Sequence, residues 1–140
     1  MVDEDFIKKM IEGKENNRFD RKLKITSKSK IAKTISAFAN TEGGILLIGV
    51  SDESRIIGID PEEEKYMINS ANDSFCIPPA SITFEDLTVV LFDGETKDGN
   101  EIALLVVHIE KSLAEKVFVK IEAKEKKAFR RVNDQTLSFE

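Results

Sequence analysis

The 140-residue sequence contains no tryptophan, one histidine and one cysteine. The lone cysteine, Cys76, cannot form a disulfide within the chain, so the fold must be stabilised by its core alone. No run of about 18 apolar residues is present, which excludes a membrane-spanning helix. The acidic first residues also lack the basic start and apolar stretch of a signal peptide. We therefore expect a cytoplasmic protein.

Nucleophilic catalysis and ATP hydrolysis find little support in the sequence. The only histidine, His108, lies inside an apolar segment over residues 104–109, and Cys76 stands just before two prolines. No third residue completes a catalytic triad with either side chain, and we interpret both as structural. A glycine-rich loop followed by Gly-Lys-Ser or Gly-Lys-Thr is absent, so we expect no ATPase activity.

Length and hydrophobic periodicity predict one α+β domain over residues 1–140, with a mixed β-sheet and helices packed on it. Expected helices cover 3–12 and 61–73, and a further helix, capped at Thr26-Ser27 or Ser29, is expected to end at Ala39-Asn40. The helix from Pro61 begins with three glutamates, which suit the positive end of a helix dipole. Expected strands cover 17–25, 45–50, 55–59, 81–92, 101–109, 117–121 and 128–132. The strands at 45–50 and 55–59 are expected to form a hairpin, and an acidic, glycine-containing turn is expected at 93–100.

Charge is distributed unevenly along the chain. The net charge of −5 argues against phosphate binding by the whole surface. Residues 18–33 nevertheless hold seven basic side chains against one acidic one, and residues 116–131 hold seven against two. A run of charge is usually only a solvated face. A local site for an anion therefore requires that these two basic segments meet in space.

Three carboxylates, Glu15, Asp20 and Asp52, could hold one or two divalent cations, because Mg²⁺ and similar ions prefer oxygen ligands. Such ions activate water and neutralise charge during phosphodiester cleavage. The spacing of these residues does not select them from the 26 acidic residues of the chain. On pattern alone, the simpler interpretation is that they are solvated acids in turns and on a strand face.

The segment from Ile35 to Ile59 joins the end of a helix, a Gly43-Gly44 turn, an apolar strand and an acidic turn. Because the glycines precede the strand, we interpret them as serving a tight turn and close packing rather than a phosphate cradle. The segment resembles the signature of the Schlafen AlbA-like domain family, with SAFANTEGG over 36–44, IGV over 48–50, Asp52, and Ile57-Gly58. Weaker similarity extends the resemblance over about residues 15–136, behind an N-terminal helix at 1–13.

The resemblance implies a domain that handles nucleic acid, as in bacterial transcriptional regulators and animal Schlafens. In Schlafen ribonucleases two glutamates and an aspartate form a metal-dependent cleavage site, and the matching positions are Glu15, Asp20 and Asp52. Asp20 is one methylene shorter than the family glutamate. Schlafen nucleases use two such lobes in one chain, whereas this chain has one, and we hypothesise that a homodimer supplies the second lobe.

The leading hypothesis is a module that binds DNA or RNA and regulates transcription. The predicted phosphate contacts are Arg18, Arg21, Lys22, Lys24, Lys28 and Lys30, with a second group of Lys126, Lys127, Arg130 and Arg131. One alternative is a ribonuclease that uses Mg²⁺ or Mn²⁺ at Glu15, Asp20 and Asp52. Another is an interaction domain without nucleic-acid binding, which the acidic net charge favours.

Overall fold

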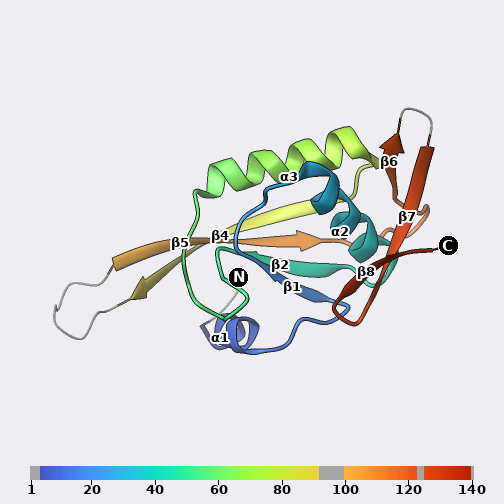
Figure 1. The fold of residues 1–140 in the computed structure, drawn as a ribbon. Helices are drawn as coiled ribbons and strands as arrows, with labels where there is room; N and C mark the ends of the chain where they lie inside the picture. Colours follow the sequence, from blue (N-terminus) through green and yellow to red (C-terminus); the bar gives the residue numbers. More distant parts are fainter. Residues whose placement is uncertain (1–3, 92–99, 123–124, 140) are drawn as a thin grey trace.

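The computed structural model describes residues 4–91, 100–122 and 125–139 (Figure 1). The turn expected at 93–100 lies almost wholly outside these residues. Within them, the helices are α1 (Glu4–Glu12), α2 (Lys28–Asn40) and α3 (Pro61–Phe75). The strands are β1 (Phe19–Lys22), β2 (Gly44–Ile48), β3 (Cys76–Ile77), β4 (Ile82–Leu91), β5 (Asn100–Ile109), β6 (Phe118–Glu122), β7 (Glu125–Val132) and β8 (Gln135–Ser138). None of the described helices is long and apolar enough to cross a membrane.

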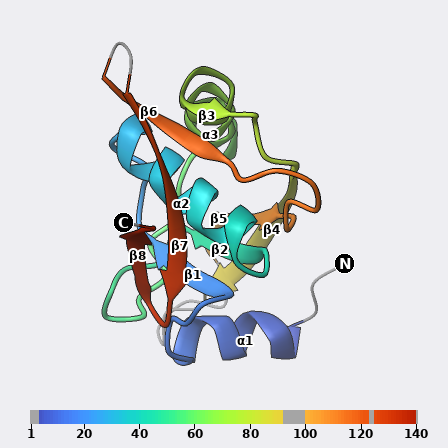
Figure 2. The same cartoon turned by 90° about the vertical axis from the view of Figure 1, so that its right-hand side faces the viewer.

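Two four-stranded sheets make up the α+β domain. The first has the order β1-β2-β5-β4, in which β1 runs parallel to β2 and the other neighbours are antiparallel. The second sheet is antiparallel, with the order β3-β6-β7-β8. Helix α2 lies between the first sheet and β7, α3 lies beside α2, and α1 lies on the other side of the first sheet (Figures 1 and 2).

Helix α2 is the centre of the core. Ser27 caps its N-terminus, where the Ser27 hydroxyl accepts a hydrogen bond from the Lys30 amide at 3.3 Å. Ile31, Ile35 and Phe38 are almost fully buried, and the alanines between them are also buried. A helix buried on so much of its surface must be covered by more than one layer, and α2 is covered by both sheets.

Strand β2 confirms the prediction of a central strand covered on both faces. Leu46 and Ile48 pack into the main core with α2, whereas Leu47 packs on the opposite face with Met10 of α1. The glycines before this strand serve the turn, as expected. Gly43 has a φ of +75°, and a Cβ at Gly44 would lie 2.3 Å from the Phe38 ring.

The prediction of a strand at 55–59 is wrong. The segment makes only an isolated bridge between Val50 and Ile56, and Ser54 and Gly58 adopt positive φ angles of 64° and 92°. These two residues turn the backbone toward β5, where the Ile59 amide donates a hydrogen bond to the Ala103 carbonyl at 3.0 Å. The pattern also missed the short strands β3 and β8, and it suggested one sheet where the described residues form two.

Candidate nucleic-acid interface

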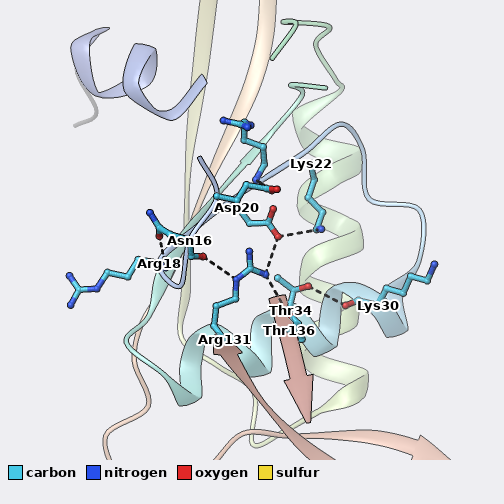
Figure 3. Close-up of polar contacts among 10 residues, drawn as sticks. Asn16, Arg18, Asp20, Lys22, Lys30, Thr34, Arg131 and Thr136 are labelled. Atoms are coloured by element: carbon cyan, nitrogen blue, oxygen red, sulfur yellow. Dashed lines mark hydrogen bonds and ion pairs between the residues drawn. The ribbon is translucent and has the colours of Figure 1, made fainter. Parts of the chain in front are cut away.

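A buried ion pair joins the two sheets beneath the candidate interface (Figure 3). Asp20 of β1 lies 3.3 Å from Arg131 of β7 and 3.4 Å from Lys22, measured between the Asp20 Oδ2 atom and each nitrogen. The Arg131 guanidinium also donates to the Asn16 carbonyl at 3.1 Å and to the Thr136 hydroxyl at 3.2 Å. Asp20 is 4% exposed and Arg131 is 5% exposed. The structure therefore places Arg131 inside the protein, where it presents no surface to a phosphate.

Arg21, another predicted phosphate contact, closes the end of α1. Its Nη1 atom donates to the carbonyls of Met10 at 2.9 Å, Ile11 at 3.1 Å and Gly13. A cation at this position satisfies helix-end carbonyls and complements the negative end of the helix dipole. Arg21 thus attaches α1 to β1 rather than projecting into solvent.

The three candidate metal-binding carboxylates lie in different environments. Glu15 accepts a hydrogen bond from the Arg21 amide at 2.9 Å, Asp20 is held by Arg131, and Asp52 is exposed in the turn after β2. Among the described residues, no group of three or more His, Cys, Asp or Glu side chains could hold a metal ion. The residues present do not fit a three-carboxylate metal site in this arrangement, and that site stays a prediction from the family resemblance.

Exposed and half-buried lysines surround the N-terminus of α2. A hollow of about 150 Å³ is lined there by Lys22, Lys24 and Lys30, with hydroxyl groups from Thr26, Ser27 and Thr34. Lys24 is also 4.0 Å from the exposed Glu63. The amides at a helix N-terminus carry partial positive charge, so lysines and hydroxyls at this point form a suitable environment for a phosphate.

An adjoining hollow of about 290 Å³ extends this basic surface. It shares Lys22 and Lys24 with the first hollow and continues to the turn of Ser51, Asp52 and Glu53. Asp52 therefore lies beside two of these lysines, although the other two candidate carboxylates do not line this hollow.

The two basic segments of the sequence meet along α2 and β7. Lys33 of α2 lies over the ring of Phe129 of β7, with its Nζ 5.7 Å from the ring centroid. Along β7, Lys127 is half-buried, whereas Lys126 and Arg130 are exposed. We define the basic strip as the exposed and half-buried basic side chains of α2 and β7, together with Lys22 of β1 and Lys24 of the loop after it, which share a hollow with Lys30. It comprises Lys22, Lys24, Lys28, Lys30, Lys33, Lys126, Lys127 and Arg130.

Arg18 and Lys28 each have a local partner. Arg18 is exposed and donates from its Nε to Glu42, and this contact lowers the pKa of the Glu42 carboxyl. Lys28 lies 5.2 Å from the centroid of the exposed Tyr66 ring.

The contribution of Lys33 and of the three hydroxyl groups was missed from the sequence, although the expected cap at Thr26-Ser27 had marked the correct helix end.

The polar residues of the signature segment hold the second sheet against α2. The Asn40 amide donates to the carbonyls of Val117 at 2.9 Å and Phe129 at 3.0 Å, and its oxygen accepts from the Val117 amide at 2.7 Å. Ser36 bonds to the same two residues, and the Thr41 hydroxyl accepts from the Arg131 amide at 2.9 Å. These side chains are structural in this chain.

Cys76 is buried in the core, and His108 is half-buried on β5. Cys76 is 3% exposed, and burial raises the pKa of its thiol to about 12, so the reactive thiolate is not formed at neutral pH. His108 of β5 lies 3.8 Å from Glu85 of β4, between the His108 Nε2 and a carboxylate oxygen.

These features define a small α+β domain with a basic strip over a buried ion pair. The family model "Schlafen, AlbA_2" matches residues 15–140, and the chain belongs to this family. A crystal structure of the DIP2311 protein from Corynebacterium diphtheriae shares the fold, with a TM-score of 0.51 and 18% sequence identity. The similarity covers 87% of this chain and 22% of that one, so the present chain corresponds to about a fifth of the larger protein.

Proposed function

We propose that this chain is a nucleic-acid-binding module that contacts phosphates through the basic strip. One observation carries the proposal: Lys22, Lys24 and Lys30 line a single hollow at the N-terminus of α2, in a chain whose net charge is −5. Neutralising phosphates with lysines releases counterions from the nucleic acid, and this release supplies most of non-specific affinity. Membership of the Schlafen AlbA_2 family supports a nucleic-acid-related role.

A regulatory role in transcription is the biological setting that we propose for this module. Its support is the resemblance of the signature segment to domains of bacterial regulators. Phosphate contacts of lysines position a protein on nucleic acid without specifying a sequence. A single module of this kind would therefore need additional base contacts to select a target.

The proposal is tested by fluorescence-anisotropy binding to a duplex DNA and a hairpin RNA at about 50 mM and about 200 mM salt. The double variant Lys24→Glu/Lys30→Glu should bind much more weakly. It should also reduce the slope of log affinity against log salt by about 2 on duplex DNA. Lys111→Glu/Lys116→Glu makes the same charge change on exposed residues outside the strip and is the matched control. Equal losses in the two double variants would contradict the proposal.

The same assay decides between the alternatives. A ribonuclease would shorten the hairpin RNA when Mg²⁺ or Mn²⁺ is added, and Asp52→Ala would abolish this cleavage. RNA that remains intact with both metals removes the ribonuclease hypothesis. Absence of binding to either nucleic acid at micromolar protein would favour an interaction domain with a protein partner.

We also propose that the module acts as a homodimer. The support is the two-lobe architecture implied by the family resemblance, since this chain supplies one lobe. Two copies would bring two basic strips to one nucleic acid, and more phosphates would then be neutralised for each complex.

A further inference from the structure

A larger hollow, of about 670 Å³, lies on the side of the first sheet that faces α1. Figure 2 shows α1 below β1, on the side of the first sheet opposite α2. Its lining comes from the end of α1, the loop that follows, β1 and β2. A volume of this size falls within the range of small-molecule sites in proteins. Of the residues that line it, Ile45 belongs to the signature segment and none belongs to the basic strip.

The floor of this hollow is apolar and contains an aromatic ring. Phe19 and Ile45 are paired residues on β1 and β2, both half-buried, and Met10 of α1 is 5% exposed. Arg21 stands by the Phe19 ring, with its guanidinium carbon 5.8 Å from the ring centroid. A floor of this kind favours a flat apolar or aromatic group over a fully hydrated one.

The rim of the hollow is cationic and polar. Lys9, Lys14 and Arg18 line it and are exposed, and none of its lining residues is acidic. Arg18 also pairs with Glu42, which lies outside the lining. The side-chain amides of Asn16 and Asn17 add hydrogen-bonding groups, although the Asn16 oxygen already accepts from the Arg18 amide and the Asn17 nitrogen donates to Glu42. The hollow therefore combines an aromatic floor, a hydrogen-bonding edge and positive charge at its mouth.

We propose that this hollow binds one unpaired nucleotide of a single-stranded nucleic acid, with the base against Phe19 and the phosphate at Lys9 and Lys14. That this nucleotide belongs to a nucleic-acid strand rests on the proposed function. The chemical group that the hollow recognises is in either case a nucleoside monophosphate. Bases in a duplex are paired and stacked, so they are not available to enter the hollow. Stacking of a base on an aromatic side chain is tolerant of base identity, and charge at the mouth would retain the phosphate.

The first experiment compares binding of a single-stranded oligonucleotide of about ten nucleotides with a duplex of equal length. Lys14→Glu should weaken single-strand binding by about tenfold at low salt and change duplex binding by no more than about twofold. Phe19→Leu, checked for an unchanged melting temperature, should weaken single-strand binding by at least about fivefold through lost stacking. Lys8→Glu changes a neighbouring exposed lysine of α1 that does not line the hollow, and it is the matched control.

The second experiment separates this proposal from the proposed function. Backbone amide NMR signals are followed while AMP, UMP or inorganic phosphate is added to the whole chain. We expect AMP and UMP to shift the signals of residues 13–19, and phosphate alone to shift them less. If these signals stay unchanged and Lys14→Glu behaves like Lys8→Glu, the proposal is wrong, even where the strip binds duplex. If the nucleotides shift them while no nucleic acid binds, the hollow is a free-nucleotide site and the proposed function fails.

Discussion

Arg130 and Arg131 show how position on a strand determines what a charged residue can do. Consecutive residues on β7 point to opposite faces, so Arg130 is exposed while Arg131 is enclosed between the sheets. Burial of a charge is tolerated only with a partner, and Asp20 supplies the opposite charge. The same pairing keeps the Arg131 guanidinium inside the protein, away from phosphates.

Replacing Arg131 by methionine should lower the free energy of unfolding by about 3–5 kcal/mol, because Asp20 is left buried without its main partner. Arg130→Met should change it by no more than about 0.5 kcal/mol. Chemical denaturation of the two variants measures the difference. The double variant Asp20→Asn/Arg131→Met should recover part of the loss, since it no longer buries an uncompensated charge. Equal stability of the two single variants would show that the buried pair is not stabilising.

Glu64 gives a prediction about pH. Its side chain is almost fully buried on α3, where one carboxylate oxygen accepts from the Ile25 amide at 3.2 Å. Burial, as the main cause, raises the pKa of this carboxyl above its ordinary value of 4.5. The folded protein therefore holds this proton at pH values where the unfolded chain has lost it, and stability falls as pH rises through that interval.

Glu64→Gln should remove this loss while keeping an oxygen that accepts from Ile25. Thermal melts between about pH 4 and 8 should show the variant gaining stability relative to the natural chain as pH rises above about 4.5. The difference should become constant once pH exceeds the raised pKa. Glu110→Gln makes the same change at an exposed position outside α3 and is the control. Parallel curves for both variants would show that Glu64 titrates normally.

At the level of helices and strands, local patterns predicted most elements but not their long-range contacts. Periodicity and caps located α1, α2 and α3, and apolar runs located β2, β4 and β5, because these features depend on neighbours in sequence. The prediction of a strand at 55–59 failed because the backbone there follows contacts of Gly58 and Ile59 with β5. The structural roles of Arg21 and Arg131 were also not predictable from the sequence. Arg21 binds backbone carbonyls, which carry no sequence signal, and the main partner of Arg131 is Asp20, which is distant in the chain.

Asn40 is the main link between α2 and the second sheet, and its removal should destabilise that link. Asn40→Ala leaves the buried Val117 amide and the Phe129 carbonyl without this partner, whereas the Val117 carbonyl keeps its hydrogen bond from the Ser36 hydroxyl. We expect a loss of roughly 2–4 kcal/mol in the free energy of unfolding. Hydrogen exchange should also show loss of protection at the Val117 amide. Asn69→Ala, the same change at an exposed position of α3, is the control. Unchanged protection at Val117 would mean that another group replaces Asn40.

Arg21 fixes α1, so its replacement should release the helix without unfolding the domain. Arg21→Gln removes the cation that joins three carbonyls at the end of α1. Limited trypsin digestion should then cut after Lys8 or Lys9 several times faster, while the remaining core stays resistant. Arg55→Gln, in an exposed loop, should leave the cleavage rate unchanged. Equal cleavage of the two variants would show that α1 is held mainly by Met10 and its apolar contacts.

For the whole molecule, the net charge and the basic strip have opposite signs, and salt should affect them differently. Strip contacts with phosphates weaken as salt rises, because released counterions no longer favour binding. Two copies of a chain with net charge −5 repel each other, and this repulsion is screened beyond about 8 Å at physiological ionic strength. Dimerisation and nucleic-acid binding should therefore respond to salt in opposite directions.

Light scattering after size exclusion tests the homodimer on this basis. At micromolar protein we expect twice the mass of one chain, and the dimer fraction should stay constant or increase between about 50 mM and about 200 mM salt. Nucleic-acid affinity of the same samples should fall over that interval, because each neutralised phosphate contributes a slope of about −0.9 on duplex DNA. A dimer that engages both strips should show about twice the slope of a monomer. A single-chain mass at all concentrations would exclude the homodimer and leave one strip, with its smaller slope, as the binding surface for duplex DNA.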